Sequence, residues 1–191
     1  MAGKAVHFPK FDFAKGEKSF KSEETRLDEN TVIIVEGIHG LNPKLTESIK
    51  EKNKYRVFVS ALTQISIDAQ NPISTTDNRL IRRIVRDYFY RGYSALETIR
   101  RWPSVKKGEE KYIFPYQENA DVMFNSALLY ELAVLKKIAD AILGEVPENV
   151  AEYAEAIRLR KFLSYFLPCK PHDVPPTSIL REFMGGSSFK Y

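Results

Sequence analysis

Two short apolar runs in the first third of the chain predict strands of a buried sheet. The first is Thr31 to Glu36 (TVIIVE), which is β-branched and uniformly apolar until its final acid. Such a run is typical of a strand buried on both faces of a parallel sheet. The second is Tyr55 to Ser60 (YRVFVS), and between the two Asn42-Pro43 predicts a helix that reaches about Lys50. The order strand, helix, strand predicts an α/β fold.

Further patterns predict a hairpin, a strand and a loop around this unit. Val6 to Phe20 has an extended segment on each side of the turn signal Lys15-Gly16, which predicts a hairpin. Asp121 to Asn125 (DVMFN) predicts another short strand. The stretch from Thr63 to Thr76 is polar, and Asn71-Pro72 marks a loop within it.

The segment from Asn78 to about Tyr90 predicts a helix with two unlike faces. The apolar face repeats at positions i, i+3, i+4 and i+7, as Ile81, Ile84, Val85 and Tyr88. The opposite face consists of arginines, namely Arg79, Arg82, Arg83 and Arg86. Four guanidinium groups within two turns repel one another, so a bound anion would stabilise them. A solvated face with Asp77, Asp87 and Glu97 as local counterions explains the same pattern, and both interpretations stay open at this point.

The rest of the chain is predicted to be mostly helical. A second helix runs from Ser94 to about Arg101 and is expected to end at Pro103. Amphipathic periodicity then predicts helices over 127–143 and 148–166. After a proline-rich connection, Ser178 to Met184 predicts one or two helical turns closed by two glycines.

Composition narrows the class of protein. The 191 residues are 43% hydrophobic, which is enough to bury the core of one ordinary domain. The one cysteine, Cys169, excludes a disulfide framework within one chain and favours a reducing, cytoplasmic setting. No apolar stretch approaches the roughly 20 residues that span a bilayer, so no membrane partner is expected. The net charge of +4 is mild and does not favour a nucleic-acid partner.

Three segments together carry a family resemblance. They are Thr31 to Leu41 (TVIIVEGIHGL), Asp77 to Gly92 (DNRLIRRIVRDYFYRG) and Lys111 to Asn125 (KYIFPYQENADVMFN). Their order and spacing resemble those of the uridine kinase and phosphoribulokinase family, as does Pro9 to Phe13 (PKFDF) upstream. The resemblance implies an incomplete P-loop NTPase-type parallel sheet with flanking helices and an arginine-rich lid helix. It places the C-terminal part of a uridine kinase-like domain at 1–126 and a helical C-terminal extension, packed on it, at 127–191.

The resemblance also implies roles for individual residues. Glu36 matches the family's acid that helps to hold Mg²⁺ beside the nucleotide phosphates. The family's lid arginines, which contact ATP and the phosphoryl group during transfer, are matched here by Arg83, Arg86 and Arg91. Two further arginines of the same helix are expected to add supporting charge to the ATP site, namely Arg79 and Arg82. Phe11 and Tyr93 fall on positions where the family binds its nucleoside with polar side chains, so the identity of the acceptor stays open.

The resemblance implies transfer of a phosphoryl group from ATP, with Mg²⁺, to a hydroxyl of a nucleoside or related small molecule. The 191 residues contain no G-x-x-x-x-G-K-[S/T] phosphate loop and no counterpart of the family's aspartate base. We therefore expect negligible turnover by this chain alone, and an exposed apolar sheet edge that a missing N-terminal half or a homodimer partner covers. A truncated gene product, a split kinase and a degenerate relative all remain open. The alternative function is a noncatalytic, arginine-lined nucleotide- or RNA-binding module.

Overall fold

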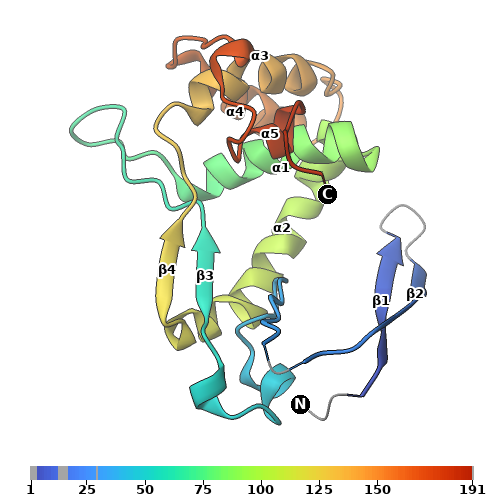
Figure 1. The fold of residues 1–191 in the computed structure, drawn as a ribbon. Coiled ribbons are helices and arrows are strands. Elements are labelled where there is room, and N and C mark those ends of the chain that lie inside the picture. The colour runs from blue at the N-terminus through green and yellow to red at the C-terminus, as the bar shows by residue number, and fades with distance from the viewer. Residues whose placement is uncertain (1–3, 13–16, 29, 191) are drawn as a thin grey trace.

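The computed structural model describes residues 4–12, 17–28 and 30–190. Helices α1, α3, α4 and α5 gather in one body, and α2 extends from this body beside a two-stranded sheet (Figure 1). A separate hairpin lies on the other side of α2 from that sheet (Figure 1). These elements give an α/β fold with a small parallel sheet and several helices. In the described residues no helix is long and apolar enough to cross a membrane.

The predicted hairpin is confirmed. Strands β1 (Val6–Asp12) and β2 (Glu17–Thr25) pair antiparallel, and the register shifts between His7 and Pro9. Proline has no backbone N–H to donate to a ladder, so an irregularity at this point is physically reasonable. The turn signal Lys15-Gly16 lies outside the described residues.

Two of the three predicted sheet strands are also confirmed. Strand β3 (Val57–Ser60) pairs in parallel with β4 (Val122–Asn125), with Val57 opposite Val122 and Ser60 opposite Asn125. The polar stretch that follows β3 contains an isolated bridge between Ser66 and Pro72, as expected of a loop. Residues that are 65 positions apart in sequence therefore form neighbouring strands that end at the same edge.

The prediction of a buried strand over Thr31 to Glu36 was wrong. The segment is not part of a strand, and its side chains are exposed, to 90% for Ile34. A strand that is buried on both faces needs a hydrogen-bonded neighbour and a covering layer on each side. Among the described residues the parallel sheet consists of β3 and β4 alone, so the segment has neither.

The predicted helix from Asn42 to about Lys50 begins at the expected place but is much shorter. It is a 3₁₀ helix over Pro43–Thr46, where the backbone N–H of Lys44 donates to Asn42 Oδ1 at 3.1 Å. A second 3₁₀ helix covers Glu51–Asn53. Neither contains a buried residue, and a short helix without a packed apolar face is not stable enough to extend.

Helix α1 (Thr75–Arg91) confirms the predicted arginine-rich helix. Ser74 caps its start by accepting a hydrogen bond from the backbone N–H of Asp77 at 3.3 Å. Gly92 ends it in the left-handed conformation, with φ of 67°, which a residue without a side chain adopts at no steric cost. The apolar face is fully buried at Ile81 and Ile84, as the periodicity predicts.

Helix α2 (Ala95–Tyr112) corrects the prediction that Pro103 ends it. The helix starts with a capping box between Ser94 and Glu97 and continues for nine residues beyond the proline. Proline costs one backbone hydrogen bond in a helix interior. Buried residues before and after it, including Ile99, Trp102 and Glu109, keep the segment helical because tertiary packing outweighs that local loss.

The C-terminal helices complete one hydrophobic core. They are α3 (Glu131–Gly144), α4 (Tyr153–Ser164) and α5 (Arg181–Met184), with short 3₁₀ helices at Phe114–Asn119 and Pro171–Asp173. All three helices were predicted, although α3 and α4 start four or five residues later. Buried leucines in or beside these helices, including Leu135, Leu159 and Leu180, pack with α1 and α2 in the same cluster. The predicted domain boundary between residues 126 and 127 falls in the connection from β4 to α3 and stays a prediction.

Candidate functional site

The arginines of α1 all pair with carboxylates of the protein itself. Arg79 pairs with Glu109, and Arg82 pairs with Glu131. The other three pair with a single acid, Asp87, and they are Arg83, Arg86 and Arg91. Of the counterions predicted from sequence, Asp87 is confirmed, whereas Asp77 pairs with Arg158 and Glu97 caps α2. The arginines are therefore divided into three separate ionic contacts, and the expected mutual repulsion is offset only in part, since three of them share one carboxylate.

Asp87 is the centre of the most charged of these contacts. Its side chain is 2% exposed, and its Oδ1 lies 3.0 Å from Arg86 Nη2 and 3.3 Å from Arg91 Nη1. Its Oδ2 lies 3.2 Å from Nε of Arg83, one helical turn earlier. We refer to these four side chains as the Asp87 cluster. Three guanidinium groups and one carboxylate give the cluster a net charge of +2.

Burial and charge act together on Arg83. Desolvation lowers its pKa below the ordinary value, and the neighbouring Arg86 and Arg91 lower it further, while Asp87 and Glu109 oppose the shift. The Nε of Arg83 is buried without a well-formed hydrogen bond, although it lies close to Asp87. A positive group that is partly desolvated and incompletely bonded favours an additional anion.

The end of α1 contributes to the same cluster. The backbone carbonyl of Asp87 accepts hydrogen bonds from the N–H groups of Gly92 and Tyr93, the latter at 3.2 Å. Carbonyl groups at the C-terminus of a helix carry partial negative charge, which stabilises a cation in the last turn. Arg91 occupies that turn and reaches back to Asp87.

Arg82 lies in a different environment from its neighbours. It is buried, with its Nε 2.9 Å from Glu131 Oε1 and its Nη2 2.7 Å from the carbonyl of Ser126, and a second bond joins Nη2 to Glu131. The guanidinium carbon lies 5.2 Å from the ring centroid of Phe183. These contacts tie α1 to the start of α3, to the residue after β4 and to α5, so its donors are occupied by protein acceptors.

Arg79 connects α1 to α2 and to the sheet. Its Nη2 donates to Glu109 of α2, and its Nη1 lies 3.4 Å from the hydroxyl of Ser60, the last residue of β3. Ser60 is the last residue of β3, and Ser126 directly follows β4, so both serines lie at the same edge of the sheet. The contacts of Arg79 with Ser60 and of Arg82 with Ser126 hold α1 against that edge. Ligands of α/β proteins bind beyond the carboxyl ends of such strands, so α1 lies beside the place where a ligand is expected.

The other predicted site residues are not brought together with the Asp87 cluster. Glu36 is exposed, and no contact among the described residues joins it to an arginine of α1. Tyr93 is half-buried, with the guanidinium of Arg101 at 4.1 Å from its ring centroid. The side chain of Phe11 lies outside the described residues, although its backbone belongs to β1.

The described residues do not by themselves form a magnesium site. No group of three or more His, Cys, Asp or Glu side chains among them is arranged to hold a metal ion. Magnesium needs several oxygen ligands in octahedral geometry, and one exposed carboxylate at Glu36 does not meet that requirement.

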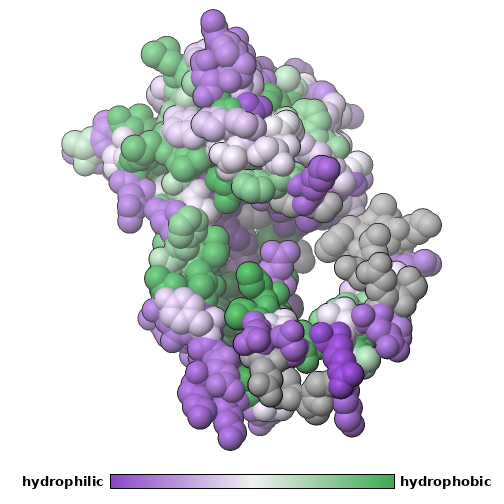
Figure 2. Space-filling model, in the orientation of Figure 1, coloured by the Kyte–Doolittle hydropathy of each residue, from purple (hydrophilic) through white to green (hydrophobic). Residues whose placement is uncertain are grey.

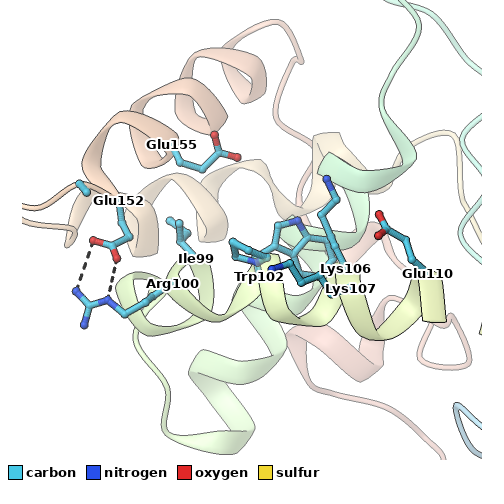
Figure 3. A pocket seen from close by; sticks show the side chains of 10 residues that line it. Ile99, Arg100, Trp102, Lys106, Lys107, Glu110, Glu152 and Glu155 are labelled. Carbon is cyan, nitrogen blue, oxygen red and sulfur yellow. Dashed lines mark hydrogen bonds and ion pairs between the residues drawn. The ribbon is translucent and has the colours of Figure 1, made fainter. Parts of the chain in front are cut away.

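Two cavities lie beside α1 and α2. The larger, about 580 Å³, is a groove between α2 and the start of α4, where Arg100 and Glu152 are joined at 2.8 Å (Figure 3). Trp102 forms part of its floor but is mostly buried, so the tryptophan is a packing residue. The smaller, about 100 Å³, lies beyond β3 and β4 and is lined in part by Asn78 and Asn125. The amide of Asn78 is buried without a hydrogen-bond partner among the described residues.

Sequence reasoning missed Glu109 and Glu131, the partners of two α1 arginines. They lie 30 and 49 positions from those arginines along the chain. Glu131 stands in a segment whose periodicity predicts an ordinary amphipathic helix, and Glu109 lies beyond Pro103, where the sequence predicted that the helix had ended. No local signal marks either acid as a counterion. The acid at position 87, four residues after Arg83, did carry a local signal.

Comparison with known proteins gives relatives of one kind. The model of the phosphoribulokinase / uridine kinase family matches residues 1–131. A uridine kinase of Streptococcus pyogenes serotype M5 (strain Manfredo) is 32% identical over 150 residues, which cover 76% of this chain and 63% of the relative. A uridine kinase of Streptococcus equi subsp. zooepidemicus (strain MGCS10565) is 31% identical with the same coverage. A uridine kinase of Staphylococcus haemolyticus (strain JCSC1435) is 30% identical over 122 residues, or 63% of this chain and 50% of the relative.

The comparison with solved structures gave no match. The chain spans less than two thirds of the length of the curated relatives that it matches. The family match covers the hairpin, both strands of the parallel sheet, α1, α2 and the Asp87 cluster. The chain therefore belongs to the phosphoribulokinase and uridine kinase family.

Proposed function

We propose that this chain serves phosphoryl transfer from ATP to a hydroxyl of a nucleoside or a related small molecule. The observation that carries the proposal is the Asp87 cluster, in which three arginines share one buried carboxylate at the end of α1. Guanidinium groups stabilise the charge that spreads over the phosphoryl oxygens in the transition state of such transfers. Family membership supports the same reaction class.

The arginines of α1 have two different roles in this proposal. Arg83, Arg86 and Arg91 contact the phosphates of ATP, and α1 acts as the lid helix. Arg79 and Arg82 do not contact the nucleotide but hold α1 against the ends of β3 and β4, because their guanidinium groups already bond to Glu109 and Glu131. Tyr93 and Phe11 remain the proposed contacts of the acceptor.

We further propose that turnover needs a phosphate-binding loop that these 191 residues do not contain. Such a loop supplies backbone N–H groups and a lysine around the phosphates, which the arginines do not replace. The proposed source is either another part of the protein or a second chain. Glu36 remains the proposed magnesium ligand, and no step is assigned to the ion because the described residues do not complete a site for it.

Isothermal titration of ATP with Mg²⁺ into the full chain tests the proposal. Arg83→Ala and Arg86→Ala should each weaken binding about 10- to 100-fold, since a hydrogen bond to a charged group contributes about 1.5–3 kcal/mol. Arg160→Ala is the matched control, because that arginine of α4 pairs with Asp140 of α3 and not with Asp87. Absence of binding at millimolar ATP, or an equal loss in the control, would overturn the proposed site.

A further inference from the structure

We propose that Asp87 is the positioning residue of this anion site, whose buried carboxylate gathers three arginines into one receptor for a polyphosphate. The inference rests on the proposed function, because it states how the site of that function is built. Asp87 does not contact the phosphates in this account. It acts through Arg83, Arg86 and Arg91.

Helix geometry makes position 87 suited to this role. Arg83 and Arg91 stand one turn before and one turn after Asp87 on the same face of α1. Arg86 precedes Asp87 directly and folds back, with its Nε 3.1 Å from Asp87 Oδ1. One carboxylate at this position therefore reaches three guanidinium groups from successive turns. Without it, the three cations would repel one another and turn apart into solvent.

The charge of the cluster selects the class of ligand. Arg83 and Arg86 alone exceed the charge of Asp87 by one, and Arg91 adds another positive charge. A single negative charge would leave part of this excess uncompensated. A tripolyphosphate carries several charges on one flexible chain, so it matches three guanidinium groups that are held together.

Burial adds a second reason for an anion at this place. Arg83 is partly desolvated, and its Nε is buried without a well-formed hydrogen bond. A cation that is partly removed from water and incompletely bonded is less stable in the free protein than a fully solvated one. An anion that accepts from Arg83 removes this cost, so the free cluster is prepared for a ligand rather than closed on itself.

The proposal and simple electrostatics predict opposite results for Asp87→Asn. Removal of a negative charge beside an anion site strengthens anion binding if only the sum of charges matters. If Asp87 positions the arginines, its neutral isostere releases them and polyphosphate binding weakens. The sign of the change therefore separates positioning from charge alone.

Calorimetric titration of the full chain with tripolyphosphate and with inorganic phosphate measures that sign. Wild type should prefer tripolyphosphate, and Asp87→Asn should weaken its binding about tenfold or more while phosphate binding changes little. Asp87→Glu, which keeps the charge but moves it by one methylene, should fall between the two. Asp140→Asn is the matched control, because it makes the same chemical change in an exposed pair with Arg160.

Each outcome has a distinct meaning. Equal or tighter tripolyphosphate binding by Asp87→Asn overturns the positioning role and leaves the arginine site standing. A wild type that binds no tripolyphosphate overturns the proposed function itself. If Asp87→Asn does not fold by circular dichroism, NMR of the arginine side chains in wild type decides. The Nε–H signals of Arg83 and Arg86 should exchange slowly and shift together when tripolyphosphate is added, and rapid, independent exchange overturns the proposal.

Discussion

Two regions of the molecule are rich in apolar residues, namely the helical body of α1, α3, α4 and α5 and the segment Thr31 to Glu36. Only the helical body forms a core. Ile81 of α1 is fully buried, whereas Ile34 is 90% exposed. Figure 2 shows hydrophobic residues at the surface in the region of β3 and β4. A helix satisfies its backbone hydrogen bonds within itself and then needs one packed face. A strand needs neighbours before burial is possible, so apolar composition alone does not make a core.

The same difference separates the two halves of the candidate site. The arginines of α1 stand on a helix that packs against α2, α3 and α5. Their guanidinium groups are held by ion pairs with Glu109, Glu131 and Asp87. Glu36 is the last residue of the exposed segment, and nothing among the described contacts fixes it. The arginine part of the candidate site is therefore better defined than the proposed metal-binding part.

The largest expected effect comes from the buried ionic contact of the helical body. Arg82→Ala should lower the free energy of unfolding by about 3–5 kcal/mol, because it leaves Glu131 buried without its partner. Denaturant unfolding measures the loss. The double variant Arg82→Met, Glu131→Leu should recover most of it, since apolar groups of similar volume need no counterion. A small effect of Arg82→Ala would show that this residue is not an anchor of α1.

The comparison between the two regions is tested directly by one substitution made twice. Ile81→Ala should destabilise the protein by about 2–5 kcal/mol, as expected for truncation of a fully buried side chain. Ile34→Ala should change the free energy of unfolding by less than about 0.5 kcal/mol, as for other exposed sites. Chemical denaturation of both variants is the measurement. A large loss for Ile34→Ala would mean that this segment is buried in solution by a partner or a second copy.

A smaller change in the free energy of unfolding, of opposite sign, is expected for a substitution in α2, which joins the helical body to the sheet region. Proline in a helix interior costs about 3 kcal/mol relative to alanine, and its rigidity in the unfolded chain returns about 0.4–1 kcal/mol. Pro103→Ala should therefore stabilise the protein by about 2 kcal/mol, and Ser104→Ala serves as the neighbouring control. Destabilisation by Pro103→Ala would show that α2 depends on the proline.

The smallest effect concerns the acid stability of the start of α2. The backbone N–H of Ser94 donates to Glu97 at 2.8 Å and lowers the pKa of that carboxyl below its ordinary value. A lowered pKa stabilises the fold above the unfolded value, near 4.5, and the contribution is lost as the pH falls through the folded pKa. The thermal midpoint of Glu97→Gln should therefore depend less on pH below about 4.5 than that of wild type. Parallel pH curves would contradict this contribution.

Local patterns predicted much of the fold because their causes are local. The i, i+3, i+4 periodicity of α1, the caps at Ser74 and Gly92 and the β-branched run of β3 each depend on neighbours within a few residues. The failures share one property. Within the described part of the chain, Thr31 to Glu36 lacks strand partners, the helix predicted to reach Lys50 lacks a packed apolar face, and α2 continues past Pro103 because it packs against other helices. In all three cases the deciding contacts come from outside the segment.

By itself, the sequence determined the amphipathic helices, the hairpin, the two paired strands and the family, and it offered Asp87 as one of three local counterions. Only the tertiary structure decided which arginines of α1 pair with acids of other helices and which share Asp87. The reason is distance along the chain, because Glu109 and Glu131 reach Arg79 and Arg82 from positions 30 and 49 residues away. A helical pattern fixes which side chains share a face, but the charge that each of them meets depends on what packs against that face.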